Sequence, residues 1–254
     1  MKVLHELVPT RKFLKTVEEI KDYVDGWNIT DSAAGIPAPS GTAVGCVLKT
    51  RFPDKIIMPI FVLNYKGPVE VAALALAADA VGLDGLVLTM GDEPRYGEPL
   101  GSKYWRRTED ARDFLKNEIK IRTTKLGCLL SPRPRRVERY GTKEFNIDDM
   151  INRVKSGWDF ALFMKLTEET LPALEQLSRG IRELKLNVSL YTYVLIGTPR
   201  NADTLKQIGW TPTTKPDNAR EFLERVNGLV DGVIITAAGD YQGELEVLKK
   251  IGRK

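Results

Sequence analysis

Eight short apolar segments, each followed by a more polar segment, constrain the fold of this chain more than any other feature. The apolar segments are rich in β-branched residues, which is typical of parallel strands covered on both faces. They span residues 3–7, 27–30, 56–63, 86–90, 125–130, 159–165, 188–196 and 232–236. Eight strands alternating with helices predict an α/β fold, a closed (β/α)8 TIM barrel. A doubly wound open sheet is the alternative, but it usually uses fewer strands.

Helical patterns lie between these strands. They cover residues 13–24, 40–49, 68–81, 109–119, 147–156, 217–226 and 241–251, and one more helix opens at Thr167. Ser40 is placed to cap the second of them, and Thr170 takes the glutamate position of a capping box that starts at Thr167. No linker or repeat divides the 254 residues, so we predict a single barrel domain over residues 1–254.

Composition excludes several classes of function. The net charge is +4, from 38 basic and 34 acidic residues, which is too mild a balance to indicate nucleic acid. His5 is the single histidine, so the chain cannot form a metal site with several histidines, and a Ser-His-Asp triad could use only His5. We therefore predict no metal site and expect carboxylates, lysines or tyrosines to carry any acid–base chemistry. No apolar run reaches membrane-spanning length and the start lacks a signal-peptide core, so we expect a cytoplasmic protein with no membrane partner.

Two acidic residues end the fourth predicted strand. The stretch 83–94 reads LDGLVLTMGDEP, with Asp92 and Glu93 between Gly91 and Pro94. Ligands of parallel α/β folds bind at the carboxyl ends of the strands, which favours a functional role for Asp92. The alternative is a turn whose aspartate only caps the next segment.

The barrel prediction brings polar residues from distant strands to one mouth. They are Glu6, Thr30, Asp31, Asn64, Asp92, Ser131, Lys165, Tyr193 and Asp240. Carboxylates around one cavity raise each other's pKa, so Glu6 could act as a general acid. Glu6 could instead pair with a nearby Lys or Arg and be structural. A lyase or aldolase that uses Lys165 as a Schiff base is a further hypothesis.

The loop after the fifth strand carries four arginines, Arg133, Arg135, Arg136 and Arg139. Guanidinium groups match phosphates or carboxylates, but such a cluster is also typical of a solvated loop. The chain has no GxGxxG or Walker-type motif, so barrel loops would have to hold any nucleotide cofactor.

Five motifs occur in an order that is familiar. They are HELVP at residue 5, NITD at 28, MPIFVLN at 58, LTMGDEP at 88 and GWDFALF at 157. Together they resemble the methylenetetrahydrofolate reductase family of flavin-dependent (β/α)8 barrels. The resemblance implies an oxidoreductase of one-carbon metabolism, leading to methionine biosynthesis, in which a reduced flavin gives a hydride to a methylene-pterin and yields the methyl-pterin. The alternative is a non-catalytic pterin-binding or electron-transfer partner subunit.

The resemblance also implies roles for individual residues. Glu6 falls on the family's general acid, and Asp92 on the aspartate beside flavin and substrate, where its charge would stabilise an iminium cation. The other implied contacts are Thr30, Asp92, Ser131 and Arg153 for the cofactor and Asn64, Met164 and Tyr193 for the substrate.

The resemblance leaves the identity of the ligands open. The implied cofactor is FAD, with FMN, a deazaflavin or NAD(P)H as alternatives. The implied partners are a reduced pterin or folate substrate and an electron-donor subunit, in a homo-oligomer. Ile60 and Met90 stand where many relatives have other residues, as do Ser131 and Met164, so the pterin could also be a methanopterin-like relative.

Overall fold

The barrel is built from eight parallel strands in sequence order. The computed structural model describes residues 1–132 and 146–251. The strands hydrogen-bond in the closed order β1-β2-β3-β4-β5-β6-β7-β8. They are β1 (Lys2–Leu7), β2 (Gly26–Ile29), β3 (Ile56–Val62), β4 (Gly85–Thr89), β5 (Lys125–Leu130), β6 (Phe160–Phe163), β7 (Ser189–Leu195) and β8 (Gly232–Thr236). The predicted (β/α)8 barrel is confirmed, because every predicted apolar segment forms a strand of this barrel.

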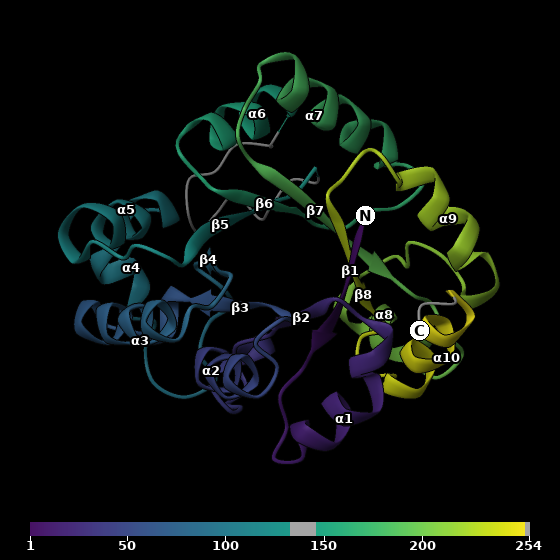
Figure 1. The fold of residues 1–254 in the computed structure, drawn as a ribbon, viewed down its shortest axis with the longest axis horizontal. Coiled ribbons are helices and arrows are strands. Elements are labelled where there is room, and N and C mark those ends of the chain that lie inside the picture. The colour runs from purple at the N-terminus through teal and green to yellow at the C-terminus, as the bar shows by residue number, and fades with distance from the viewer. Residues whose placement is uncertain (133–145, 252–254) are drawn as a thin grey trace. The chain divides into compact units, whose positions relative to one another are not determined.

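Helices follow the strands, as Figure 1 shows. The α-helices are α1 (Phe13–Ile20), α2 (Gly41–Arg51), α3 (Pro68–Val81), α4 (Gly101–Tyr104), α5 (Thr108–Asp113), α6 (Ile147–Lys155), α7 (Leu171–Glu183), α8 (Ala202–Ile208), α9 (Ala219–Val226) and α10 (Tyr241–Ile251). The shorter turns are η1 (Lys21–Tyr23), η2 (Ala33–Gly35), η3 (Leu63–Tyr65), the π-helix η4 (Phe114–Ile119) and η5 (Pro216–Asn218).

Several helices differ from their predictions. The helix predicted over 109–119 is two elements, because α5 gives way to the π-helix η4 at Phe114. The helix predicted to open at Thr167 begins at Leu171, since the Thr170 hydroxyl accepts the Thr167 N–H at 2.8 Å within a separate turn. Helices α4 and α8 lie in segments predicted as loops, and both are short enough to give little periodicity.

The chain forms two compact units, each described separately. The first, called here the N-terminal unit, comprises Glu6–Glu18 and Gly26–Cys128. In it α2 packs on β3 and beside α3 (Figure 1). The predicted cap of α2 is confirmed, because the Ser40 hydroxyl accepts the Ala43 N–H at 3.4 Å. This unit carries the loops that follow β2, β3 and β4.

The second, called the C-terminal unit, comprises Met1–His5, Glu19–Asp25 and Leu129–Lys254. In it β6 pairs with β7 and β7 with β8, so the ends of these three strands are neighbours. Helix α6 lies beside α7, and α10 lies beside α9 (Figure 1). Phe160 and Phe163 of β6 are buried in the core. This unit carries the loops that follow β6, β7 and β8.

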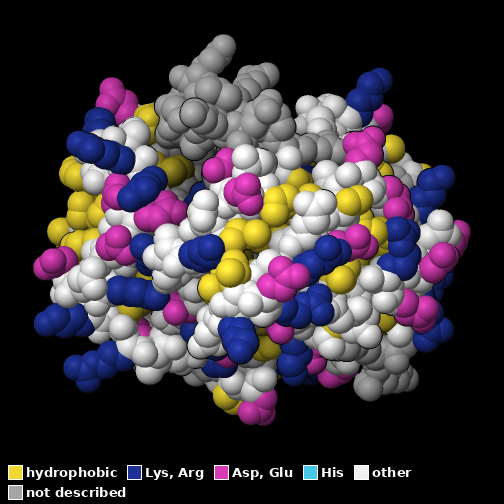
Figure 2. Space-filling model, turned by 90° about the horizontal axis from the view of Figure 1, so that it is seen from above, with side chains coloured by type: hydrophobic (Ala, Val, Ile, Leu, Met, Phe, Trp, Pro, Cys, Tyr) yellow, Lys and Arg dark blue, Asp and Glu magenta, His cyan; other side chains and the backbone are white. Residues whose placement is uncertain are grey.

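Charges of both signs are interspersed on the face drawn in Figure 2, in keeping with the nearly balanced composition. Within residues 1–132 and 146–251, no helix combines the length and the apolar character that crossing a membrane requires. The predicted arginine cluster of Arg133, Arg135, Arg136 and Arg139 lies outside the described residues.

Candidate active site

A narrow cleft opens in the C-terminal unit at the carboxyl ends of β6, β7 and β8. Its empty volume is about 340 Å³, including space open to solvent. The residues that line it are Lys165, Leu166, Thr167, Tyr193, Leu195, Trp210, Thr211, Thr213 and Thr236. Barrel enzymes carry their active sites at this edge of the strands. The cleft is therefore the candidate active site of this unit.

Lys165 is the charged side chain of the cleft. It lies two residues after the end of β6, and its backbone has φ +56°, in the left-handed region that a residue with a side chain rarely adopts. Such backbone strain is concentrated at functional sites. The Lys165 Nζ lies 5.8 Å from the centre of the Trp210 ring, close enough for a cation–π contact.

Hydrogen bonds fix the segment that carries Trp210. Gly209 ends α8 in the left-handed conformation, with φ +66°, and the Trp210 N–H donates to the Leu205 carbonyl at 2.9 Å. The Thr213 hydroxyl donates to the Leu166 carbonyl at 2.7 Å and accepts the Leu195 N–H at 2.9 Å. Thr213 thus ties this segment to the ends of both β6 and β7, which holds the indole over Lys165.

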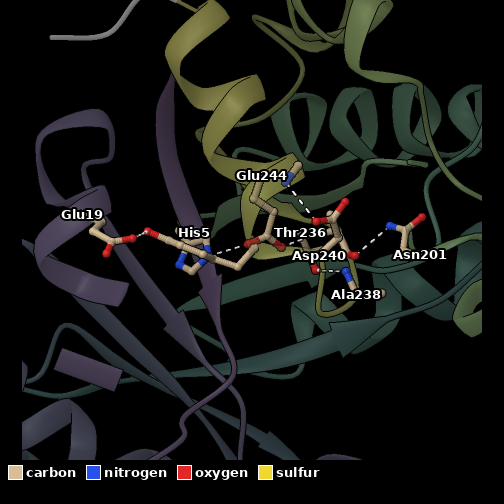
Figure 3. A network of polar contacts seen from close by, with 10 residues as sticks. His5, Glu19, Asn201, Thr236, Ala238, Asp240 and Glu244 are labelled. Atoms are coloured by element: carbon tan, nitrogen blue, oxygen red, sulfur yellow. Dashed lines mark hydrogen bonds and ion pairs between the residues drawn. The ribbon is translucent and has the colours of Figure 1, made fainter. Parts of the chain in front are cut away.

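A buried polar network links β1, α10 and the loop after β8 (Figure 3). His5 on β1 and Glu244 on α10 are 2% and 5% exposed, and Nε2 of His5 lies 2.7 Å from Oε2 of Glu244. The other oxygen of Glu244 accepts the N–H of Ala237, the first residue after β8. This carboxylate therefore joins β1, α10 and the loop after β8.

Asp240 lies in the same loop and is also engaged (Figure 3). Its carboxylate accepts the Thr198 hydroxyl at 2.6 Å and the Gly243 N–H at 3.1 Å, and Nη1 of Arg200 lies at 3.6 Å. Burial favours the neutral acid, but these hydrogen bonds and the Arg200 charge outweigh it and lower the pKa of Asp240 below its usual value. Asp240 is therefore ionised at neutral pH.

The N-terminal unit holds a second polar cluster, where β2 and β3 end. Lys66 Nζ lies 2.5 Å from Oδ2 of Asp31 and donates to the Val62 carbonyl at 2.9 Å. The same carboxylate oxygen accepts the Val62 N–H at 3.2 Å. Both charged groups are buried and satisfied by each other, which is the arrangement of a structural ion pair.

Asp92, which the sequence predicts to be a catalytic and cofactor-binding residue, lies at the surface. It is exposed, and its carboxylate accepts the Ala34 N–H at 3.1 Å, so it stabilises the η2 turn. The Asn64 amide donates to the carbonyls of Gly91 and Asp92, at 3.5 and 3.4 Å. The alternative reading of Asp92 as a residue that satisfies a turn fits this geometry. Thr30 follows β2 and is half-buried.

The other predicted site residues are dispersed. Glu6 is half-buried in β1, Ser131 is buried after β5, and Met164 is half-buried after β6. Arg153 lies on α6, with its guanidinium 6.0 Å from the centre of the Trp158 ring. Tyr193, by contrast, lines the cleft with Lys165. The catalytic and binding roles of these residues stay predictions.

Sequence reasoning missed two residues of the cleft and one residue of the buried network, Glu244. Trp210 and Thr213 lie beyond a loop that gave only turn signals, and nothing in the local pattern ties them to β6. Glu244 lies within a helix whose pattern indicated an ordinary amphipathic element. The single histidine was a usable signal, because a lone buried imidazole needs a polar partner.

Comparison with known proteins gives the fold. No protein-family model and no curated protein matches the sequence. A structure described as a structural study of a project from Aquifex aeolicus VF5 has a TM-score of 0.57 and 14% identity, covering 100% of this chain and 93% of that one. KGPDC from Streptococcus mutans has a TM-score of 0.54 and 14% identity, covering 99% of this chain and 98% of that one. Identities this low show a shared barrel fold.

The prediction of a methylene-pterin reductase is wrong. One structural neighbour, KGPDC, is described as a 3-keto-L-gulonate-6-phosphate decarboxylase and not as a flavin-dependent reductase. The correction extends to the alternative role as a pterin-binding or electron-transfer subunit and to the flavoprotein and methionine-pathway assignments. The motif resemblance itself, the cofactor FAD and the predicted partners are tested by none of these comparisons.

Proposed function

We propose that the chain is an enzyme of the lyase class that binds a small carbonyl substrate as a Schiff base on Lys165. One observation carries the proposal: a lysine with a left-handed backbone lines the cleft at the carboxyl ends of β6, β7 and β8. Barrel enzymes place reactive side chains at the ends of their strands, and a strained backbone is retained where the surrounding structure enforces it.

The chemistry follows from the amine. The uncharged Nζ of Lys165 attacks the substrate carbonyl carbon, and the carbonyl oxygen leaves as water to give a protonated imine. The bond between the carbon next to the iminium group and its hydroxyl-bearing neighbour then breaks. Its electron pair moves into the iminium group to give an enamine, while the departing fragment loses its hydroxyl proton and leaves as a carbonyl compound. Protonation of the enamine carbon gives a new imine. Hydrolysis of the new imine returns the free amine and a carbonyl product.

Trp210 supports the charged species of this sequence. Its ring face, 5.8 Å from Nζ, attracts a cation, and the protonated imine carries the same positive charge as the resting ammonium group. Because the ammonium form is not nucleophilic, imine formation increases with pH in the neutral to alkaline range. Tyr193 lines the cleft and is the side chain proposed to exchange protons with the substrate.

Reductive trapping tests the proposal. The protein is incubated with glyceraldehyde and cyanoborohydride at about pH 7 and about pH 9, and the labelled lysines are mapped by peptide mass spectrometry. Lys185→Arg is a matched control, because Lys185 also has a positive φ, +50°, but is exposed at the end of α7. We expect about tenfold more label on Lys165 than on Lys185, lost in Lys165→Arg and unchanged in Lys185→Arg. Equal labelling of the two lysines would refute the assignment.

A further inference from the structure

The loop after β8 adjoins the candidate active site, because Thr236 lines the cleft and its hydroxyl accepts the Ala238 N–H at 3.2 Å. Barrel enzymes often bind a phosphate group in the loops after the seventh and eighth strands, where backbone N–H groups and a helix N-terminus point at the anion. In this chain, side-chain carboxylates accept N–H groups of the loop after β8 and of the start of α10. Glu244 accepts the Ala237 N–H and Asp240 accepts the Gly243 N–H at 3.1 Å, as the network in Figure 3 makes visible.

The hydroxyl donors beside the loop are also engaged. The Thr198 hydroxyl donates to Oδ2 of Asp240 at 2.6 Å, and the Asn201 amide donates to the carbonyls of Ile196 and Ala237, at 2.8 and 2.7 Å. The Ala238 N–H donates to the Thr236 hydroxyl at 3.2 Å. A phosphate that bound these groups would therefore have to displace hydrogen bonds that are already made within the protein.

Charge acts in the same direction. Asp240 is ionised and only 7% of its side chain is exposed, so its negative charge is poorly screened by water. The nearby cation, Arg200, is mostly exposed and lies 3.6 Å from Asp240, where it offsets part of that charge. A dianionic group brought beside Asp240 would meet repulsion as well as the loss of hydrogen bonds.

We infer that Asp240 and Glu244 make this barrel selective for unphosphorylated carbonyl substrates. The inference rests on the proposed function of Lys165 and adds the class of substrate. The proposed substrate class differs from that of KGPDC, because the name 3-keto-L-gulonate-6-phosphate decarboxylase indicates a phosphorylated substrate. The two carboxylates fill, with groups of the protein itself, the place that a substrate phosphate would take.

A pair of aldehydes tests the inference. Trapping on Lys165 is compared for glyceraldehyde and glyceraldehyde 3-phosphate in the wild type, in Asp240→Asn and in Asp203→Asn. Asp203 is an exposed aspartate of α8, so its replacement removes the same charge away from the loop after β8. We expect the wild type to prefer glyceraldehyde by about tenfold and Asp240→Asn to reduce that preference by about fivefold. Asp203→Asn should keep the preference of the wild type.

A binding measurement separates the two proposals. The melting temperature of each protein is followed with and without about 10 mM inorganic phosphate, which does not require a reactive lysine. Stabilisation of Asp240→Asn but not of the wild type supports the inference, even if neither aldehyde labels Lys165 and the proposed function fails. Wild-type protein that traps the phosphorylated aldehyde equally well, or that phosphate stabilises as much as the variant, would overturn it.

Discussion

Asp79 gives the most quantitative prediction for the stability of the barrel. It lies near the end of α3, and its carboxylate accepts the N–H groups of Arg122, Thr123 and Thr124 at 3.0, 2.7 and 2.8 Å. The Thr123 hydroxyl adds a fourth hydrogen bond at 2.7 Å. Together these bonds tie the segment that enters β5 to the end of α3. Replacing Asp79 should therefore loosen the start of that strand.

The magnitude follows from the pKa. Burial favours the neutral acid, but the hydrogen bonds outweigh it and lower the pKa of Asp79 from 3.8 to about 2. This lowering of the pKa corresponds to about 2.4 kcal/mol of stability, and solvent screening of a partly exposed group reduces the value to about 1 kcal/mol. Asp79→Asn should cost about that amount. Asp79→Ala should cost about 2 kcal/mol, because it also leaves three N–H groups without the carboxylate.

Urea unfolding at several pH values measures this effect. The depressed pKa stabilises the folded state above about pH 4, and that stabilisation disappears as the pH falls through about 2. The difference between wild type and Asp79→Asn should therefore shrink over that interval. Asp54→Asn, at an exposed aspartate, is the control and should cost less than about 0.5 kcal/mol. A difference that stays constant down to about pH 2, or one no larger than that of the control, would refute the reasoning.

Two further predictions concern Gly35 and Tyr65 of the N-terminal unit, and Gly209, which follows α8, is the control for the first. Gly35→Ala should lower the free energy of unfolding by more than about 2 kcal/mol, because φ is +69° and the new Cβ would lie 1.9 Å from a backbone carbonyl oxygen. Gly209→Ala, where φ is +66° but the space is open, should lower it by only about 1 kcal/mol. Thermal or urea unfolding measures both, and equal costs would contradict the steric argument. Burial and the charges of Asp92 and Asp31 raise the pKa of Tyr65 to about 12. Asp92→Asn removes one of these charges, so the Tyr65 phenol should ionise at lower pH in an ultraviolet titration. An unchanged titration curve would count against the coupling between Asp92 and Tyr65.

Much of the fold could be predicted from the sequence, because strands covered on both faces have a distinctive composition. The strands β5 and β8 were predicted at their observed bounds, and α3 was predicted over its full length. The boundary between α5 and η4 was not predictable, since a π-helix has no separate apolar period over six residues. The roles of individual site residues were harder to predict. Asp92 follows a buried strand as predicted, yet its side chain stabilises a neighbouring turn.

The sequence by itself determined that Lys165 lies at the end of a buried strand, because the apolar run ends there. It could not determine that Trp210 covers this lysine. That contact depends on Thr213, which hydrogen-bonds to Leu166 and Leu195, residues 47 and 18 positions away. Hydrogen bonds between such distant positions leave no period in the sequence, so only the tertiary structure decides which loop lies beside Lys165.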